Sequence, residues 1–139
     1  MKRYVALLRG INISGKNKVP MAELKNGFEQ LTFKEVRTYL NSGNVAFSCN
    51  EADIEKITGQ IALMIKRKFD LDIPIFVIST EALADILHHA PLWWGDDNKE
   101  IYDNLIFVIP PTRISEVYRE MGSPKIELEK TADYKEAIF

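Results

Sequence analysis

The residues from Arg9 to Lys18 include three cations and two asparagine amides, and they contain no acid. Guanidinium and ammonium groups form charge-assisted hydrogen bonds with phosphate or carboxylate groups. A second polar run without an acid, Asn41-Ser42-Gly43-Asn44, occurs further along the chain. Two such segments brought together would form an anion-binding site. We predict that its ligand-binding residues are Arg9, Asn12, Lys16, Asn17, Lys18, Asn41, Ser42 and Asn44.

The first polar segment lies between two predicted elements. Tyr4–Leu8 is apolar at every position, which predicts a strand with both faces buried. Pro20 suits the first turn of a helix, and apolar residues follow at helical spacing from 21 to 31. The segment is therefore expected to be a loop that leads into a helix N-terminus, where backbone N–H groups favour anions.

The second polar segment is expected to be the turn of a β-hairpin with strands at 35–40 and 44–49. An amphipathic helix over 54–65, which Asn50 can cap, and a strand over 73–79 complete the order β-α-β-β-α-β. That order is typical of a ferredoxin-like unit. In this topology the loop after the first strand and the hairpin turn share one end of the sheet, so we expect the two polar segments to be adjacent.

A second series follows, with a helix, a strand, a helix and two strands expected at 80–89, 104–109, 113–121, 125–130 and 134–139. We predict an α+β fold of two ferredoxin-like β-α-β-β-α-β halves packed as one body, residues 1–79 and 80–139. The second half is expected to be incomplete. Because an unpaired final sheet edge would be exposed, we also expect self-association of this truncated form.

Charge is spread unevenly along the chain. Residues 1–50 hold 8 Lys/Arg and 3 Asp/Glu, or +5, whereas residues 51–139 hold 10 and 17, or −7, which gives the net charge of −2. The N-terminal excess indicates an anionic partner. The net charge of the whole chain disfavours an indiscriminate nucleic-acid binder. Apolar runs are strand-sized and no signal-peptide pattern is found, so we expect a cytoplasmic protein without membrane contact.

Gly10, Gly15 and Lys16 match the spacing of a phosphate-binding P-loop. In that motif the next residue carries the hydroxyl that ligates magnesium, but here it is Asn17. The expected sheet is also antiparallel, whereas a P-loop enzyme has a parallel one, so a nucleoside triphosphatase is not predicted. Binding of RNA across the sheet needs stacking aromatics, of which the predicted third strand offers only Phe47. The loop would still be able to contact phosphates.

Two further groups of residues allow more than one interpretation. His88 and His89 have the spacing of a metal pair with Asp85, but histidine at a helix C-terminus also interacts favourably with the helix dipole. Trp93 and Trp94 are interpreted either as a ligand lid or as a cover for the edge of the core. The single cysteine excludes an internal disulfide. We expect no metal and no cofactor.

Two blocks of the sequence together resemble the bacterial family known as domain of unknown function 1697. They are the run Leu8–Asn12 followed by Gly15–Met21, and the later block Val36–Val45. The resemblance implies two ferredoxin-like halves. Members of that family continue past this end with a basic segment that carries Thr, Arg and Asn, which implies that a composite site would be incomplete here. Ser14 stands where the family usually has glycine. The resemblance implies no reaction.

Three functions follow as hypotheses from these residues. The first is binding of a phosphorylated small molecule or nucleotide by the loop and the turn. The second is an enzyme that acts on an anionic substrate, in which Arg9 or Lys16 would stabilise developing charge and the catalytic groups are unidentified. The third is an interaction module for protein or nucleic acid.

Overall fold

The computed structural model describes residues 1–95, 104–109, 112–121 and 131–139. The chain divides into two compact units, Met1–Ala82 and Leu83–Phe139. The fold is α+β, as predicted, since helices accompany two antiparallel sheets. Among the residues that the structure describes, no helix is long and apolar enough to cross a membrane.

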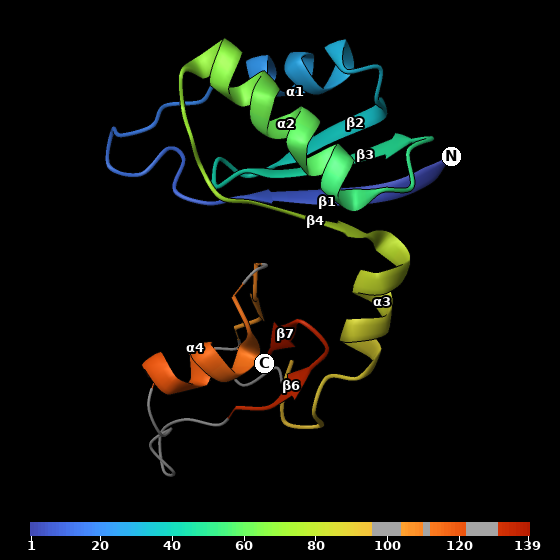
Figure 1. Cartoon of the computed structure of the whole chain (residues 1–139), viewed down its shortest axis with the longest axis vertical. Helices are drawn as coiled ribbons and strands as arrows, with labels where there is room; N and C mark the ends of the chain where they lie inside the picture. The colour runs from blue at the N-terminus through green and yellow to red at the C-terminus, as the bar shows by residue number, and fades with distance from the viewer. Residues whose placement is uncertain (96–103, 110–111, 122–130) are drawn as a thin grey trace. The chain divides into compact units, whose positions relative to one another are not determined.

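The first unit has the element order β-α-β-β-α-β that its apolar periodicity predicts. Its elements are β1 (Lys2–Leu8), α1 (Met21–Gln30), β2 (Lys34–Tyr39), β3 (Asn44–Cys49), α2 (Ile54–Phe69) and β4 (Ile75–Ser79). The strands form one sheet in the order β2-β3-β1-β4, with every neighbouring pair antiparallel. Both helices cover the same face of this sheet (Figure 1).

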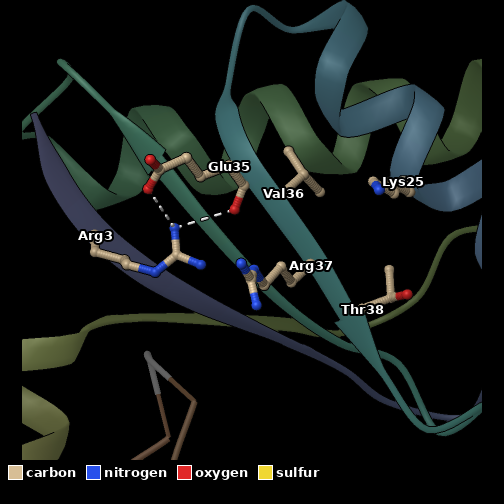
Figure 2. A pocket seen from close by; sticks show the side chains of 6 residues that line it. All are labelled: Arg3, Lys25, Glu35, Val36, Arg37 and Thr38. Atoms are coloured by element: carbon tan, nitrogen blue, oxygen red, sulfur yellow. Dashed lines mark hydrogen bonds and ion pairs between the residues drawn. The ribbon is translucent and has the colours of Figure 1, made fainter.

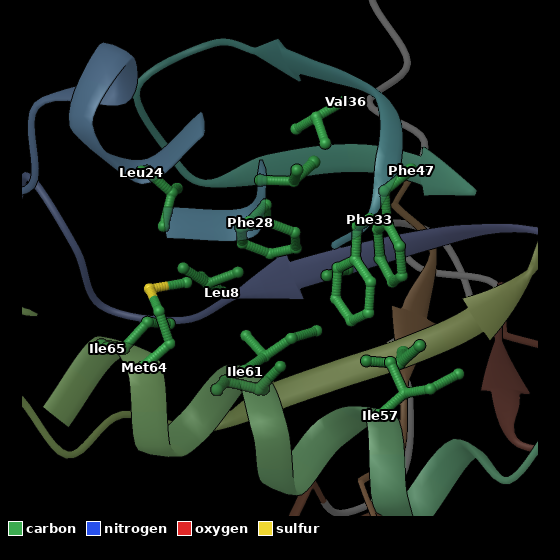
Figure 3. Packing of buried hydrophobic residues seen from close by; sticks show 14 of the residues in the cluster. Leu8, Leu24, Phe28, Phe33, Val36, Phe47, Ile57, Ile61, Met64 and Ile65 are labelled. Atoms are coloured by element: carbon green, nitrogen blue, oxygen red, sulfur yellow. The ribbon is translucent and has the colours of Figure 1, made fainter. Parts of the chain in front are cut away.

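The core of the first unit lies between that face and the two helices (Figure 3). Its aromatic centre is formed by Phe28, Phe33 and Phe47, whose ring centroids lie 4.6 to 6.0 Å apart. From β1 only alternate residues are buried, because successive side chains of a strand point to opposite faces. Val5 and Leu7 are half-buried, so the prediction that both faces of this strand are buried was wrong.

The start of α2 differs from the sequence-based expectation. Its N-cap is Asp53, whose Oδ1 accepts hydrogen bonds from the backbone N–H groups of Glu55 (3.0 Å) and Lys56 (3.4 Å). Asn50 does not cap the helix. The Glu51 carboxylate accepts from the N–H of Asp53 at 3.0 Å and so keeps this segment outside the helix.

The second unit is smaller and its strands are short. The helix α3 (Thr80–His88) leads into it, and β5 (Ile106–Phe107), α4 (Ile114–Met121), β6 (Asp133–Tyr134) and β7 (Ala137–Ile138) follow. Its sheet has the order β5-β7-β6. The single strand predicted for 134–139 was wrong. Lys135, with φ +51°, reverses the chain there and forms a hairpin of β6 with β7. The strand predicted for 125–130 lies outside the described residues.

Candidate functional site

One side chain, Asn12, holds the loop between β1 and α1 (residues 9–20, the β1–α1 loop). Its Nδ2 donates to the carbonyl oxygens of Val19 (3.0 Å) and Asn41 (2.8 Å). Its Oδ1 accepts from the backbone N–H of Val19 at 2.8 Å. Val19 is buried in the core beside the start of α1. These three bonds fix the base of the loop against the folded unit.

The β1–α1 loop meets the turn between β2 and β3 (residues 40–43, the β2–β3 turn). The Asn12–Asn41 bond joins the two segments, and the N–H of Leu8 donates to the carbonyl of Gly43 at 2.9 Å. A Cβ added to Gly43 would lie 2.8 Å from both Leu8 Cβ and Ile11 Cδ1, so any other residue would displace these side chains. The two polar segments are therefore adjacent, as the topology predicted.

Left-handed backbone is concentrated in the loop. Three of its non-glycine residues have positive φ, namely Asn12 (+54°), Ser14 (+48°) and Asn17 (+52°). Asparagine tolerates this conformation better than most residues, whereas serine gains little from it. The tip closes with reciprocal backbone hydrogen bonds between Ile13 and Lys16, at 2.7 and 3.2 Å. The loop thus has a specific conformation that hydrogen bonds maintain.

The amides of the predicted site are largely occupied by these internal bonds. Both N–H groups of Asn12 are donated, and those of Asn44 go to Tyr39 O (2.8 Å) and Ser42 Oγ (3.0 Å). Asn17 Nδ2 donates to Gly10 O at 2.9 Å. The side chains of Asn12 and Asn44 therefore keep no N–H group for a ligand, and their role is to shape the backbone.

The cations of the predicted site are available. Arg9, Lys16 and Lys18 are exposed, and the side chain of none of them makes a hydrogen bond or ion pair with any other described residue. Asn41 and Ser42 on the turn are also exposed. The structure thus presents three exposed positive charges on a loop whose base is anchored by hydrogen bonds.

The structure adds apolar residues that the sequence reasoning missed. Ile13 in the loop and Tyr39 and Leu40 at the turn have 56%, 70% and 63% of their surface exposed. Strand alternation was the signal that could have found Tyr39. Side chains of β2 point in turn to the two faces of the sheet, and Tyr39 lies on the face opposite that of the buried Val36. Exposed apolar groups beside cations suit a ligand that combines an anion with an apolar part.

A second feature of the first unit is a polar hollow at the edge strand β2 (Figure 2). It is lined by Arg3, Lys25, Glu35, Val36, Arg37 and Thr38. Arg3 donates to the carbonyl of Glu35 at 3.1 Å and to Ser48 Oγ at 3.0 Å, and it lies 3.8 Å from the Glu35 carboxylate. The Glu35 carbonyl and carboxylate thus lie beside the guanidinium of Arg3, whereas the exposed side chain of Arg37 makes no hydrogen bond or ion pair with another described residue.

In the second unit, Asp85 of α3 collects several polar partners. Its Oδ2 accepts from Lys135 Nζ at 2.6 Å and from Tyr134 Oη at 3.1 Å, while His89 stacks on Tyr134 with ring centroids 4.1 Å apart. The hydrogen bond from Lys135 holds the pKa of Asp85 below its usual value and raises that of Lys135. The ring of His88 packs edge-on against that of His89, with centroids 5.8 Å apart, but does not contact Asp85 by a hydrogen bond or ion pair. Among the described residues, no group of three or more potential ligand side chains has the geometry to hold a metal ion.

Of the pair Trp93 and Trp94, the contacts of Trp94 indicate its role. Trp94 Nε1 donates to the carbonyl of Asn104 at 3.0 Å, and its ring packs edge-on against Phe139 at 5.4 Å. Both partners belong to the second unit, so Trp94 covers an edge of that unit's own apolar residues. Of the two interpretations of the pair, the structure favours this one for Trp94.

Comparison with known proteins finds a similar solved structure and a matching family. The conserved bacterial protein SP0830 from Streptococcus pneumoniae has a similar solved structure, with a TM-score of 0.79 and 27% sequence identity. The match covers 99% of this chain and 74% of that one. No curated protein matches the chain. A sequence model of one family matches all of residues 1–139, and the chain therefore belongs to the family described as protein of unknown function (DUF1697).

Proposed function

We propose that the β1–α1 loop and the β2–β3 turn bind the phosphate group of an anionic small molecule. The observation that carries this proposal is the set of three exposed cations, Arg9, Lys16 and Lys18, on a loop whose base is fixed by hydrogen bonds. The N-terminus of α1 supports the same charge preference, since its first N–H groups have no partner within the helix.

The residues of the site have two different roles in this proposal. Arg9, Lys16 and Lys18 contact the anion directly, together with the exposed polar groups of Asn41 and Ser42. Asn12, Asn17 and Asn44 are positioning residues, since their amides bond to the backbone or to Ser42. A ligand that reaches the cations meets a loop that is already ordered, so little entropy is lost in ordering it.

Two or three charge-assisted hydrogen bonds contribute about 1.5–3 kcal/mol each. After the loss of translational and rotational freedom, such a site corresponds to affinities of about micromolar to millimolar. Salt also weakens the attraction between exposed lysines and an anion. At physiological ionic strength, solvent-exposed charges more than about 8 Å apart are largely screened. The proposed site is thus a recognition site of moderate affinity.

The proposal is tested by titration of the whole chain with inorganic pyrophosphate, followed by amide NMR shifts. We expect saturable shifts in residues 9–20 and 40–43, and about tenfold or greater weakening in Arg9→Ala and Lys16→Ala. Lys68→Ala, which removes an exposed lysine at the end of α2, is the matched control and should bind as the parent does. Equal weakening in the control, or shifts spread over the whole surface, would show non-specific attraction instead.

One finer point of the fold also belongs to this proposal. We propose that the second unit is a smaller counterpart of the first, since among the described residues β5, α4 and β6 repeat the order strand, helix, strand. Catalysis is not part of the proposal, because the described structure offers no general base bonded to the cations of the loop.

A further inference from the structure

The apolar residues at the end of the sheet are placed beside the proposed anion site. Ile13 directly follows Asn12, and Leu40 directly precedes Asn41, so each is one residue from the 2.8 Å hydrogen bond that joins the loop and the turn. Tyr39 precedes Leu40 and pairs with Asn44 across the hairpin. All three side chains are more than half exposed. Exposed apolar side chains on both the loop and the turn therefore flank the bond that joins these two segments.

Folding does not account for the presence of leucine at position 40. Leu40 has φ +60°, a left-handed conformation that disfavours leucine and suits glycine or asparagine. Its side chain is 63% exposed, so burial does not compensate for the backbone strain. Residues in such strained backbone conformations cluster at active sites and ligand-binding sites.

Tyr39 supplies a flat ring on the outer face of the sheet. Arg37 lies two residues earlier in the same strand, in a stretch of regular pairing with β3, so both side chains are on the same face. Figure 2 shows Arg37 on the side of the sheet away from the helices, while Val36 points toward them. Tyr39 stands at the end of β2 between Arg37 and the β2–β3 turn, which is bonded to the loop that carries the cations. An exposed ring in this place is suited to stack a planar group that also carries phosphate.

We infer that the ligand of this site is a nucleotide, either free or at the end of a single strand, whose base stacks on Tyr39 against Leu40. Its phosphate lies on the cations of the β1–α1 loop. This inference rests on the proposed function and adds the identity of the ligand. An anionic membrane surface fits less well, since three lysine and arginine side chains and two aliphatic ones supply little attraction, and the chain carries a net charge of −2.

The test compares inorganic pyrophosphate, ADP and a five-nucleotide single-stranded RNA in the whole chain by calorimetry and NMR. We expect ADP to bind about tenfold or more tightly than pyrophosphate, because stacking adds to the phosphate contacts. In Tyr39→Ala this advantage should disappear while pyrophosphate binding is unchanged. If pyrophosphate binds and ADP binds no more tightly, the nucleotide inference is wrong and the proposed anion site stands. If neither binds, the proposed function itself fails.

Leu40→Asn separates a binding role from a structural one. Asparagine is favoured in left-handed backbone, so the melting temperature should be unchanged or higher, whereas ADP binding should weaken at least threefold. Leu63→Asn, at a half-exposed leucine of α2, is the control and should leave ADP binding unchanged. Unaltered ADP binding in Leu40→Asn would overturn the assigned contact.

Arg37→Ala distinguishes the two sources of the ligand. If the RNA binds more tightly than ADP and loses affinity in Arg37→Ala, with a shallower salt dependence, the ligand is the end of a strand. If ADP binds as tightly as the RNA and Arg37→Ala changes neither affinity, the ligand is a free nucleotide. Either result supports the inference. Binding to phosphatidylglycerol vesicles, with no preference for ADP over pyrophosphate, would contradict it and identify a membrane surface.

Discussion

Replacement of Asn12 by alanine should loosen the β1–α1 loop at its base. The substitution removes three hydrogen bonds, two to the backbone of Val19 and one to the carbonyl of Asn41. It also leaves the N–H of Val19, a residue with 1% of its surface exposed, without its acceptor. The loop and the β2–β3 turn then lose the side-chain bond that joins them.

Asn17→Ala is a close control for this change. Asn17 has nearly the same backbone conformation as Asn12, with φ +52° against +54°, so alanine introduces the same strain of about 1 kcal/mol at either position. The side chain of Asn17 makes one hydrogen bond where that of Asn12 makes three. At about 1 kcal/mol for each bond, Asn12→Ala should lower the free energy of unfolding by about 2 kcal/mol more than Asn17→Ala.

The difference can be measured by urea unfolding followed by circular dichroism, and locally by amide hydrogen exchange at Val19. For a unit of this size, 2 kcal/mol corresponds to a decrease in melting temperature of about 8–16 °C. Exchange of the Val19 amide should accelerate in Asn12→Ala and stay near the parent rate in Asn17→Ala. Equal destabilisation by the two variants would refute the assignment of Asn12 as the anchor of the loop.

Three other predictions follow from single contacts. Gly43→Ala should lower stability by about 3 kcal/mol or more, since φ is +96° and the new Cβ would lie 2.8 Å from two side-chain atoms. Gly59→Ala, in open space within α2, should instead raise it by about 0.5–1 kcal/mol, and thermal melts compare the two. Asp53→Ala should lower stability by about 1 kcal/mol through loss of the N-cap, with recovery in Asp53→Ser. Because the pKa of Asp85 is lowered in the folded state, its contribution to stability is complete above pH 3.8 and is lost as the pH falls through the folded-state pKa. NMR titration should show the pKa of Asp85 rise toward its usual value in Lys135→Met.

Much of the first unit follows from its sequence because local pattern and tertiary burial agree there. The apolar stripe of α2 and the alternation of β3 each identify an element and its buried face. The topology then requires the loop and the turn to meet, and the Asn12–Asn41 hydrogen bond is the contact that results. Element order and strand order are therefore set by the same hydrophobic pattern.

The elements that sequence reasoning missed depend on contacts between neighbouring polar groups. Asn50 and Asp53 are both competent N-caps, and the choice is made by the carboxylate of Glu51, which accepts hydrogen bonds from the N–H groups of Ala52 and Asp53. In the second unit, Lys135 takes a left-handed conformation without any glycine or asparagine to signal a turn. Its ammonium group lies 2.6 Å from Asp85, a contact fifty residues away in the chain that no local pattern indicates.

The different fates of the amides and the cations in the β1–α1 loop have a physical cause. A loop with several left-handed residues directs its carbonyl groups away from regular ladders, and those groups still need hydrogen-bond donors. Short asparagine side chains reach the nearby backbone, as the bond from Asn17 to Gly10 shows, whereas the longer lysines extend into solvent. Loss of binding in an asparagine variant would therefore report loop disorder and say nothing about ligand contact. Only a cation variant in which the Val19 amide stays protected from exchange isolates the interaction with the anion.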